Sequence, residues 1–93
     1  MSSHTAYVIA YDLSCDRERG RVDKLLQGVG FRVQKSVFEA RLNRGGHQRL
    51  VGSLGAFELQ TGFVKLYALS PQAHHVVIGE APPSFDDAFA FVV

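Results

Sequence analysis

The sequence predicts a mixed α+β domain whose elements follow the order strand, helix, strand, strand, helix, strand. Three observations lead to this prediction. An apolar run rich in β-forming residues ends at Leu13, and an amphipathic helical pattern follows it as far as Gly30. Two short extended runs, a glycine-bearing helical pattern and a further strand then occupy the chain up to Pro71.

Composition limits the class of protein before any motif is considered. The chain has 93 residues, 46% of them hydrophobic, which suits one domain with a real core that still gains from a partner chain. No apolar stretch reaches the roughly 20 residues of a spanning helix, and the first residues lack a signal-peptide pattern. We therefore expect a cytoplasmic protein that does not contact a membrane. Cys15 is the only cysteine, which excludes an internal disulfide and favours an incidental loop thiol.

Charge is distributed unevenly along the chain. Residues 1–50 hold nine Lys or Arg against five Asp or Glu, a balance of +4, whereas residues 51–93 hold one against four, a balance of −3. A basic first half is consistent with nucleic-acid binding, although the net charge of +1 makes this a weak indication.

The first strand is expected over residues 6–13, where nearly continuous apolar character suits a central strand covered on both faces. Ser14 or Asp16 is expected to cap the helix that follows, and Gly30 to end it. Its apolar stripe repeats at helical spacing and consists of Val22, Leu25, Leu26 and Val29. A separate face carries Arg17, Arg21 and Lys24.

The middle of the chain predicts a hairpin and a second helix. Residues 31–42 are long enough for two short strands with a tight turn near Lys35 and Ser36. Asn43 is expected to cap the second helix, which Gly52 and Gly55 weaken. Its apolar face comprises Leu50, Val51, Leu54 and Phe57. A strand is expected over residues 61–69.

The C-terminal residues predict contact with a second copy of the chain. Residues 75–79 are expected to form a short strand and residues 80–84 an extended connector. Residues 85–93 are apolar and alternating, a pattern that needs a pairing partner such as a second copy. We assign residues 1–80 to a core domain of ferredoxin-like, split βαβ type, and residues 81–93 to a connector and dimer-packing strand that is exchanged with the partner or packed on it.

The candidate chemistry centres on Asp12, which ends an apolar strand just before a helix rich in arginine. Mg²⁺ commonly uses one or two carboxylates together with water and substrate phosphate. If a two-fold axis brought two Asp12 side chains together, one ion could bridge the dimer and activate a water. The residues alone leave this metal interpretation and a turn or capping role about equally open.

Two segments resemble a known family. Residues 7–14 read Tyr-Val-Ile-Ala-Tyr-Asp-Leu-Ser, and residues 30–42 read Gly-Phe-Arg-Val-Gln-Lys-Ser-Val-Phe-Glu-Ala-Arg-Leu. Together they are similar to the small CRISPR-associated protein Cas two (Cas2), and the second segment is the more specific. The likeness continues through residues 64–69 and 77–79, so it covers nearly the whole chain.

This resemblance implies a ferredoxin-like homodimer whose C-terminal strand packs on the partner protomer. It also implies a role in CRISPR adaptation, in which the dimer bridges two copies of the Cas-one integrase while DNA lies across it. Some members of the family are Mg²⁺-dependent endonucleases on single-stranded RNA or duplex DNA, and others act only as a scaffold.

The resemblance also assigns roles to individual residues. It favours Asp12 as the metal ligand and implies catalytic positions at Asp12, Arg19, Arg21, Arg32 and Phe38. The residues themselves suggest phosphate contacts at Arg17, Arg19, Arg21 and Lys24. Exposed arginines are most often a solvated face, however, and Phe38 reads more simply as core or dimer interface.

Four functions remain open at this point. The first is a DNA-binding scaffold of the adaptation complex, and the second is a metal-dependent phosphodiesterase that uses paired Asp12 side chains. The third is a toxin-like ribonuclease of the virulence-associated protein D type, which shares the fold and the strand-end acid. The fourth is a regulatory ferredoxin-like dimer without nucleic acid.

Overall fold

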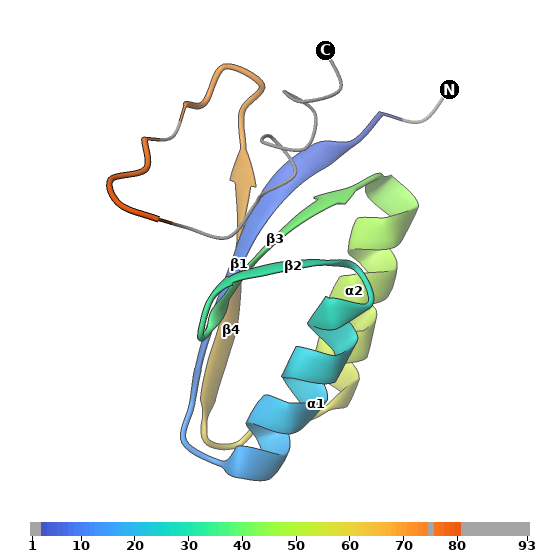
Figure 1. Ribbon diagram of the computed structural model, residues 1–93. Coiled ribbons are helices and arrows are strands. Elements are labelled where there is room, and N and C mark those ends of the chain that lie inside the picture. Colours follow the sequence, from blue (N-terminus) through green and yellow to red (C-terminus); the bar gives the residue numbers. More distant parts are fainter. Residues whose placement is uncertain (1–2, 75, 81–93) are drawn as a thin grey trace.

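The computed structural model describes residues 3–74 and 76–80. Its six elements follow the predicted order (Figure 1). They are β1 (Thr5–Leu13), α1 (Asp16–Gln27), β2 (Gly30–Gln34), β3 (Val37–Leu42), α2 (Arg44–Ala56) and β4 (Gly62–Leu69).

The four strands form one antiparallel sheet in the order β2-β3-β1-β4. Both helices lie on the same side of this sheet, and no helix of the described residues covers the other face (Figure 1). Strand β1 is interior and pairs with β3 on one side and β4 on the other. The ferredoxin-like prediction is confirmed, and the hairpin turn falls at Lys35 and Ser36 as expected.

The core lies between the sheet and the helices. Alternate residues of β1 face the helices, where Ile9, Tyr11 and Leu13 are buried. The same layer receives Phe38, which is fully buried. The remaining core residues come from both helices and from β3 and are Val22, Leu26, Ala40, Leu42, Leu50 and Leu54.

Two boundaries of α1 differ from the prediction. Cys15 occupies the N-cap position and makes no side-chain capping bond, so neither Ser14 nor Asp16 caps the helix. The helix ends at Gln27 with Gly28 as its C-cap, where the backbone N–H groups of Gly28 and Val29 donate to the carbonyl groups of Leu25 and Leu26 respectively. Gly30 is instead the first residue of β2. A side chain there would collide with the Glu39 carbonyl, which explains the need for glycine.

The second helix agrees with the prediction at its start. The Asn43 side chain accepts a hydrogen bond of 2.8 Å from the backbone N–H of Gly46, which is the expected N-cap. Leu50 and Leu54 are buried, and Phe57 packs against the core. Val51 is exposed, so its assignment to the apolar face was wrong.

The predicted strand at residues 75–79 is absent from the described part of that segment. Val76 and Ile78 are largely exposed, and residues 76–79 pair with none of the four described strands. A strand requires a neighbouring edge to which its backbone can bond. The predicted C-terminal strand of residues 81–93 lies outside the described residues.

The two faces of β1 are not equally covered. The prediction that both faces would be covered holds for the helix face, whereas Val8, Ala10 and Asp12 lie on the other, open face. The neighbouring strand β4 places Phe63, Tyr67 and Leu69 on this face, and β2 at the opposite edge of the sheet places Phe31 there. All four side chains are substantially exposed.

Candidate functional site

Asp12 lies at the carboxyl end of β1 with its side chain exposed on the open face. Its cross-strand neighbour is Phe63 on β4, and strand alternation turns Tyr11 to the opposite face as the sequence predicts. Among the described residues, no hydrogen bond or ion pair reaches the Asp12 carboxylate. This carboxylate is therefore available to an external ligand.

The backbone around Asp12 is closely packed. Gly62 pairs with Leu13, and a Cβ atom on Gly62 would lie only 1.7 Å from the Asp12 carbonyl oxygen. Only glycine permits this approach. The Leu13 carbonyl accepts a hydrogen bond of 2.7 Å from the Arg19 guanidinium. The end of β1 is thus held from both β4 and α1.

Glu18 links α1 to the segment that precedes β4. Its carboxylate accepts hydrogen bonds from the backbone N–H groups of Gln60, at 2.7 Å, and Thr61, at 3.1 Å. It also accepts a bond from the Thr61 hydroxyl. The hydroxyl and backbone bonds hold the pKa of Glu18 below its usual value.

The arginines of α1 divide into two groups. Arg19 is half-buried, bonds to Leu13 and forms an ion pair with Asp16 across one helical turn. Its guanidinium is therefore already engaged by the protein. Arg17, Arg21 and Lys24 are exposed along the outer side of the helix, which fits the predicted phosphate contacts better.

Arg32 and Phe38 lie on the helix side of the sheet, where Arg32 joins a polar network with Asp23 and Tyr11. The Arg32 guanidinium pairs with Asp23 at 3.0 Å and lies 5.1 Å from the centre of the Phe38 ring. Asp23 also accepts a hydrogen bond from the Tyr11 hydroxyl. The hydrogen bond with Asp23 raises the pKa of Arg32, and burial, assisted by Asp23, raises the pKa of Tyr11.

The residues predicted to be catalytic do not form one cluster within the protomer. Asp12 lies on the open face, whereas Arg32 and Phe38 lie on the face that packs against the helices. Phe38 is fully buried, so its ring is out of reach of a substrate and has a structural role in the core. Arg32 connects α1 to the hairpin through Asp23 and the Lys35 carbonyl. Arg21 remains exposed and available for contact.

The described residues of one protomer do not form a complete metal site. No group of three or more His, Cys, Asp or Glu side chains within residues 3–74 and 76–80 could hold a metal ion. Asp12 contributes one carboxylate, and Mg²⁺ bound by one or two carboxylates relies on water and phosphate for its other ligands. The donor chemistry fits Mg²⁺ only if a second protomer or a substrate completes the site.

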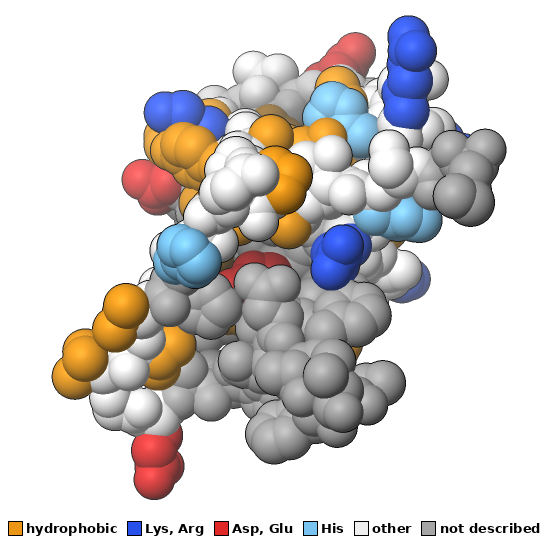
Figure 2. All heavy atoms as spheres, turned by 90° about the horizontal axis from the view of Figure 1, so that it is seen from above, with side chains coloured by type: hydrophobic (Ala, Val, Ile, Leu, Met, Phe, Trp, Pro, Cys, Tyr) orange, Lys and Arg blue, Asp and Glu red, His pale blue; other side chains and the backbone are white. Residues whose placement is uncertain are grey.

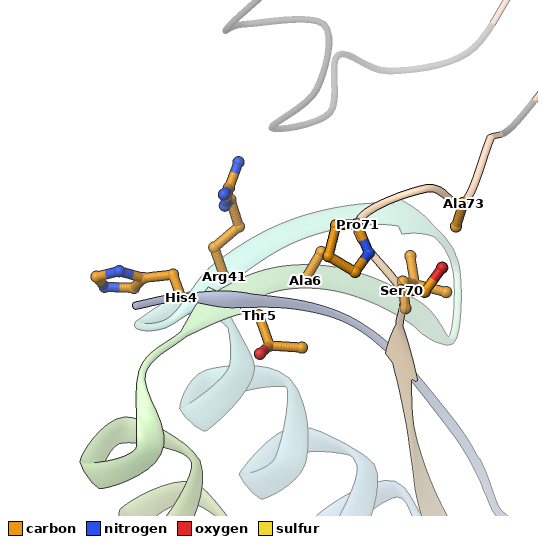
Figure 3. A pocket seen from close by; sticks show the side chains of 8 residues that line it. His4, Thr5, Ala6, Arg41, Ser70, Pro71 and Ala73 are labelled. Carbon is orange, nitrogen blue, oxygen red and sulfur yellow. The ribbon is translucent and has the colours of Figure 1, made fainter. Parts of the chain in front are cut away.

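A separate hollow lies at the opposite end of the sheet (Figure 3). Its volume is about 240 Å³, and Arg41 and His4 line one side while Ser70 and Pro71 line another. Ala6, the lining residue of β1 that is nearest to Asp12, lies six positions from it along the strand, a distance of roughly 20 Å. The view of this end shows Lys and Arg side chains that are separated from one another rather than a continuous basic ridge (Figure 2).

Sequence reasoning missed the residues that support the site. Thr61 and Gly62 follow α2, and their contacts with Glu18 and Asp12 join parts of the chain more than 40 residues apart. The pairing of Asp23 with Arg32 was also missed, because Asp23 is close in sequence to the arginines of its own helix and these are equally plausible partners. The Tyr11 hydroxyl likewise finds its acceptor outside its own strand, at Asp23 of α1.

The fold and the site define a class: a ferredoxin-like domain with two helices on one face and a free strand-end carboxylate on the other. No helix in the described part is long and apolar enough to cross a membrane. A family model described as CRISPR associated protein Cas2 matches residues 5–72. The chain belongs to the Cas2 family, as its resemblance implied.

Individual proteins agree with this assignment. A CRISPR-associated endoribonuclease Cas2 of Thermus thermophilus is 48% identical over 67 residues, which are 71% of this chain and 71% of the relative. The crystal structure of hypothetical protein TT1823 from Thermus thermophilus superposes with a TM-score of 0.77 and 28% identity. The match covers 88% of this chain and 99% of that one. A structure described as cas2 has a TM-score of 0.72 at 28% identity, with 84% and 90% coverage.

Proposed function

We propose that this protein acts as a homodimer that binds nucleic acid during CRISPR adaptation and cleaves phosphodiester bonds with Mg²⁺ held by paired Asp12 side chains. The observation that carries the proposal is the exposed Asp12 carboxylate, which has no partner among the described residues. A relative that is 48% identical is named an endoribonuclease, which supports RNA as the substrate.

The open face of the sheet supports the homodimer. It combines small side chains on β1, such as Ala6 and Ala10, with exposed aromatic residues at its edges. Phe63 is 55% exposed and lies directly beside Asp12. Aromatic residues are enriched at protein interfaces, and on this face they lie among the charged side chains of Glu39, Arg41 and Lys65. Packing of two such faces about a two-fold axis would bring the two copies of Asp12 toward each other.

The second copy also accounts for the segment without a strand partner. Strand β4 is at the edge of the sheet, so its outer backbone groups are available for pairing. The exposed residues Val76, Val77 and Ile78 have the composition of a strand. Pairing of this segment with β4 of the partner would bury these residues and cover the β4 edge of each protomer.

The exposed cations of α1 support nucleic-acid binding. Arg17, Arg21 and Lys24 recur at helical spacing and therefore lie on one side of the helix that begins just after Asp12. Such cations contact phosphates without reading base sequence. A nucleic acid held along α1 would place its backbone near the strand end.

The proposed partner is the Cas-one integrase, which the dimer would bridge while DNA lies across it. Membership in the Cas2 family supports this assignment. A protein that binds nucleic acid and bridges the integrase needs no catalytic metal, so a scaffold without cleavage is the alternative outcome.

The proposal is tested with labelled single-stranded RNA and duplex DNA, each incubated with Mg²⁺. The variant Asp12→Asn keeps the size of the side chain and removes its charge. The matched control is Glu39→Gln, another carboxylate on the open face. We expect Asp12→Asn to lose at least roughly 100-fold in cleavage while RNA affinity stays within about twofold, since removal of an essential catalytic group costs rates of this order. Equal cleavage by wild type and Asp12→Asn would contradict the metal mechanism.

A further inference from the structure

Thr61 lies at the centre of hydrogen bonds that join three segments near Asp12. Its backbone N–H and hydroxyl both donate to the Glu18 carboxylate. Its hydroxyl oxygen accepts a bond of 3.2 Å from the backbone N–H of Cys15, and its carbonyl accepts one of 3.4 Å from Ser14. A single residue before β4 therefore bonds to the loop between β1 and α1 and to the first turn of α1.

The Thr61 hydroxyl acts both as a donor and as an acceptor. A hydroxyl has one hydrogen to donate and lone pairs to accept with, and Thr61 donates to Glu18 while it accepts from Cys15. Valine has the same shape but offers neither function. Serine retains both, which makes the two substitutions a matched pair.

The bonds of Thr61 bear directly on the position of Asp12. Ser14 and Cys15 follow Asp12 in the chain, and Gly62 packs against the Asp12 carbonyl from β4. The end of β1 is thus fixed through its own loop and through its cross-strand neighbour. A shift of the Asp12 backbone would therefore be opposed by the bonds of Ser14 and Cys15 to Thr61 and by the close approach of Gly62.

We propose that Thr61 and Glu18 form a clamp that positions Asp12 for its divalent cation, and this inference rests on the proposed function. Neither residue touches the ion, so both are positioning residues. Two carboxylates that share one ion must present their oxygen atoms at fixed places, because Mg²⁺ demands near-octahedral geometry at short distances. Loss of an outer partner of a metal site typically costs roughly 10- to 100-fold in metal affinity.

The experiment compares Thr61→Val with Thr61→Ser and with Thr5→Val. Thr5 begins β1 at the far end from Asp12, so Thr5→Val repeats the same chemical change at a remote site. The first readout is the Mg²⁺ concentration that half-saturates the NMR shift of the Asp12 amide, measured without nucleic acid. The second readout is hydrogen exchange of the amides of residues 13–15. RNA affinity without metal is measured alongside.

We expect Thr61→Val to raise the half-saturating Mg²⁺ concentration about tenfold and to speed exchange at residues 13–15. Thr61→Ser and Thr5→Val should both behave as wild type, and RNA affinity without metal should be unchanged in every variant. An unchanged Mg²⁺ midpoint in Thr61→Val would overturn the clamp, and so would unchanged exchange. A wild-type protein without any Mg²⁺ response would overturn the proposed metal site, and the exchange measurement would still decide on the clamp.

Discussion

The two faces of the sheet differ in how far one protomer completes them. On the helix face, Phe38 is fully buried and the hydroxyl of Tyr11 bonds to Asp23. On the open face, Phe63 and Tyr67 are about half exposed, and among the described residues the Asp12 carboxylate has no partner. The helix face therefore accounts for the stability of the protomer, and the open face is where a second copy and a ligand would bind.

The largest expected contrast is between an aromatic residue on each face. Phe38→Ala should lower the free energy of unfolding by about 3–5 kcal/mol, because it removes a fully buried ring and leaves a cavity. This loss should be the same at every protein concentration. Phe63→Ala should lower stability only as far as dimerisation contributes, so its effect should increase with protein concentration. Urea unfolding at several concentrations measures both, and a concentration-independent loss for Phe63→Ala would contradict the comparison.

A charge on the open face should break the dimer without unfolding the protomer. Phe63→Glu is expected to weaken association by about 2 kcal/mol, roughly 30-fold in the dissociation constant, as for an aromatic residue central to an interface. Analytical ultracentrifugation measures the change. Val51→Glu is the control, because Val51 is an exposed apolar residue on α2. Equal association of Phe63→Glu and wild type would assign the dimer contact to another surface.

Loss of charge at Asp23 tests the network on the helix face. Asp23→Asn should lower the free energy of unfolding by about 1–2 kcal/mol, because Arg32 loses its ion pair in a partly buried site and Tyr11 loses a charged acceptor. Association measured by ultracentrifugation should not change. A large effect on the dimer with no effect on unfolding would reverse the roles assigned to the two faces.

The smallest expected effect is that of the Tyr11 hydroxyl, and it depends on pH. Tyr11→Phe should cost about 1 kcal/mol at neutral pH, where the phenol is protonated and donates to Asp23. The folded-state pKa of Tyr11 is raised, so its contribution is fully present below the unfolded value near 10 and is lost as pH rises through the folded value. Unfolding of wild type and Tyr11→Phe should therefore converge in strong alkali. A constant difference between them would contradict this origin of the shift.

The elements of the fold could be predicted because local patterns determine them. The apolar run that ends at Leu13 indicates strand β1, and the helical repeat of Val22 and Leu26 indicates helix α1. Helix ends were less predictable, since Gly28 and Gly30 both fit a stop signal and only the pairing of β2 with β3 assigns Gly30 to a strand.

The site could be predicted only in part, for a related reason. Asp12 was found because a strand-end acid is visible in the sequence. Its supports at Thr61 and Gly62 were not found, because they reach it across the sheet from the other half of the chain. The resemblance placed Arg32 and Phe38 among the catalytic positions, whereas strand register puts both on the face opposite to Asp12.

The most direct test of the account is the distance between the two copies of residue 12 in the dimer. A spin label at position 12, introduced as Asp12→Cys in a Cys15→Ser background, reports this distance through dipolar coupling between protomers. We predict one short distance with strong broadening of the spectrum, which Phe63→Glu abolishes. A dimer with a long or undetectable distance would contradict the claim that the open faces meet and pair their Asp12 carboxylates.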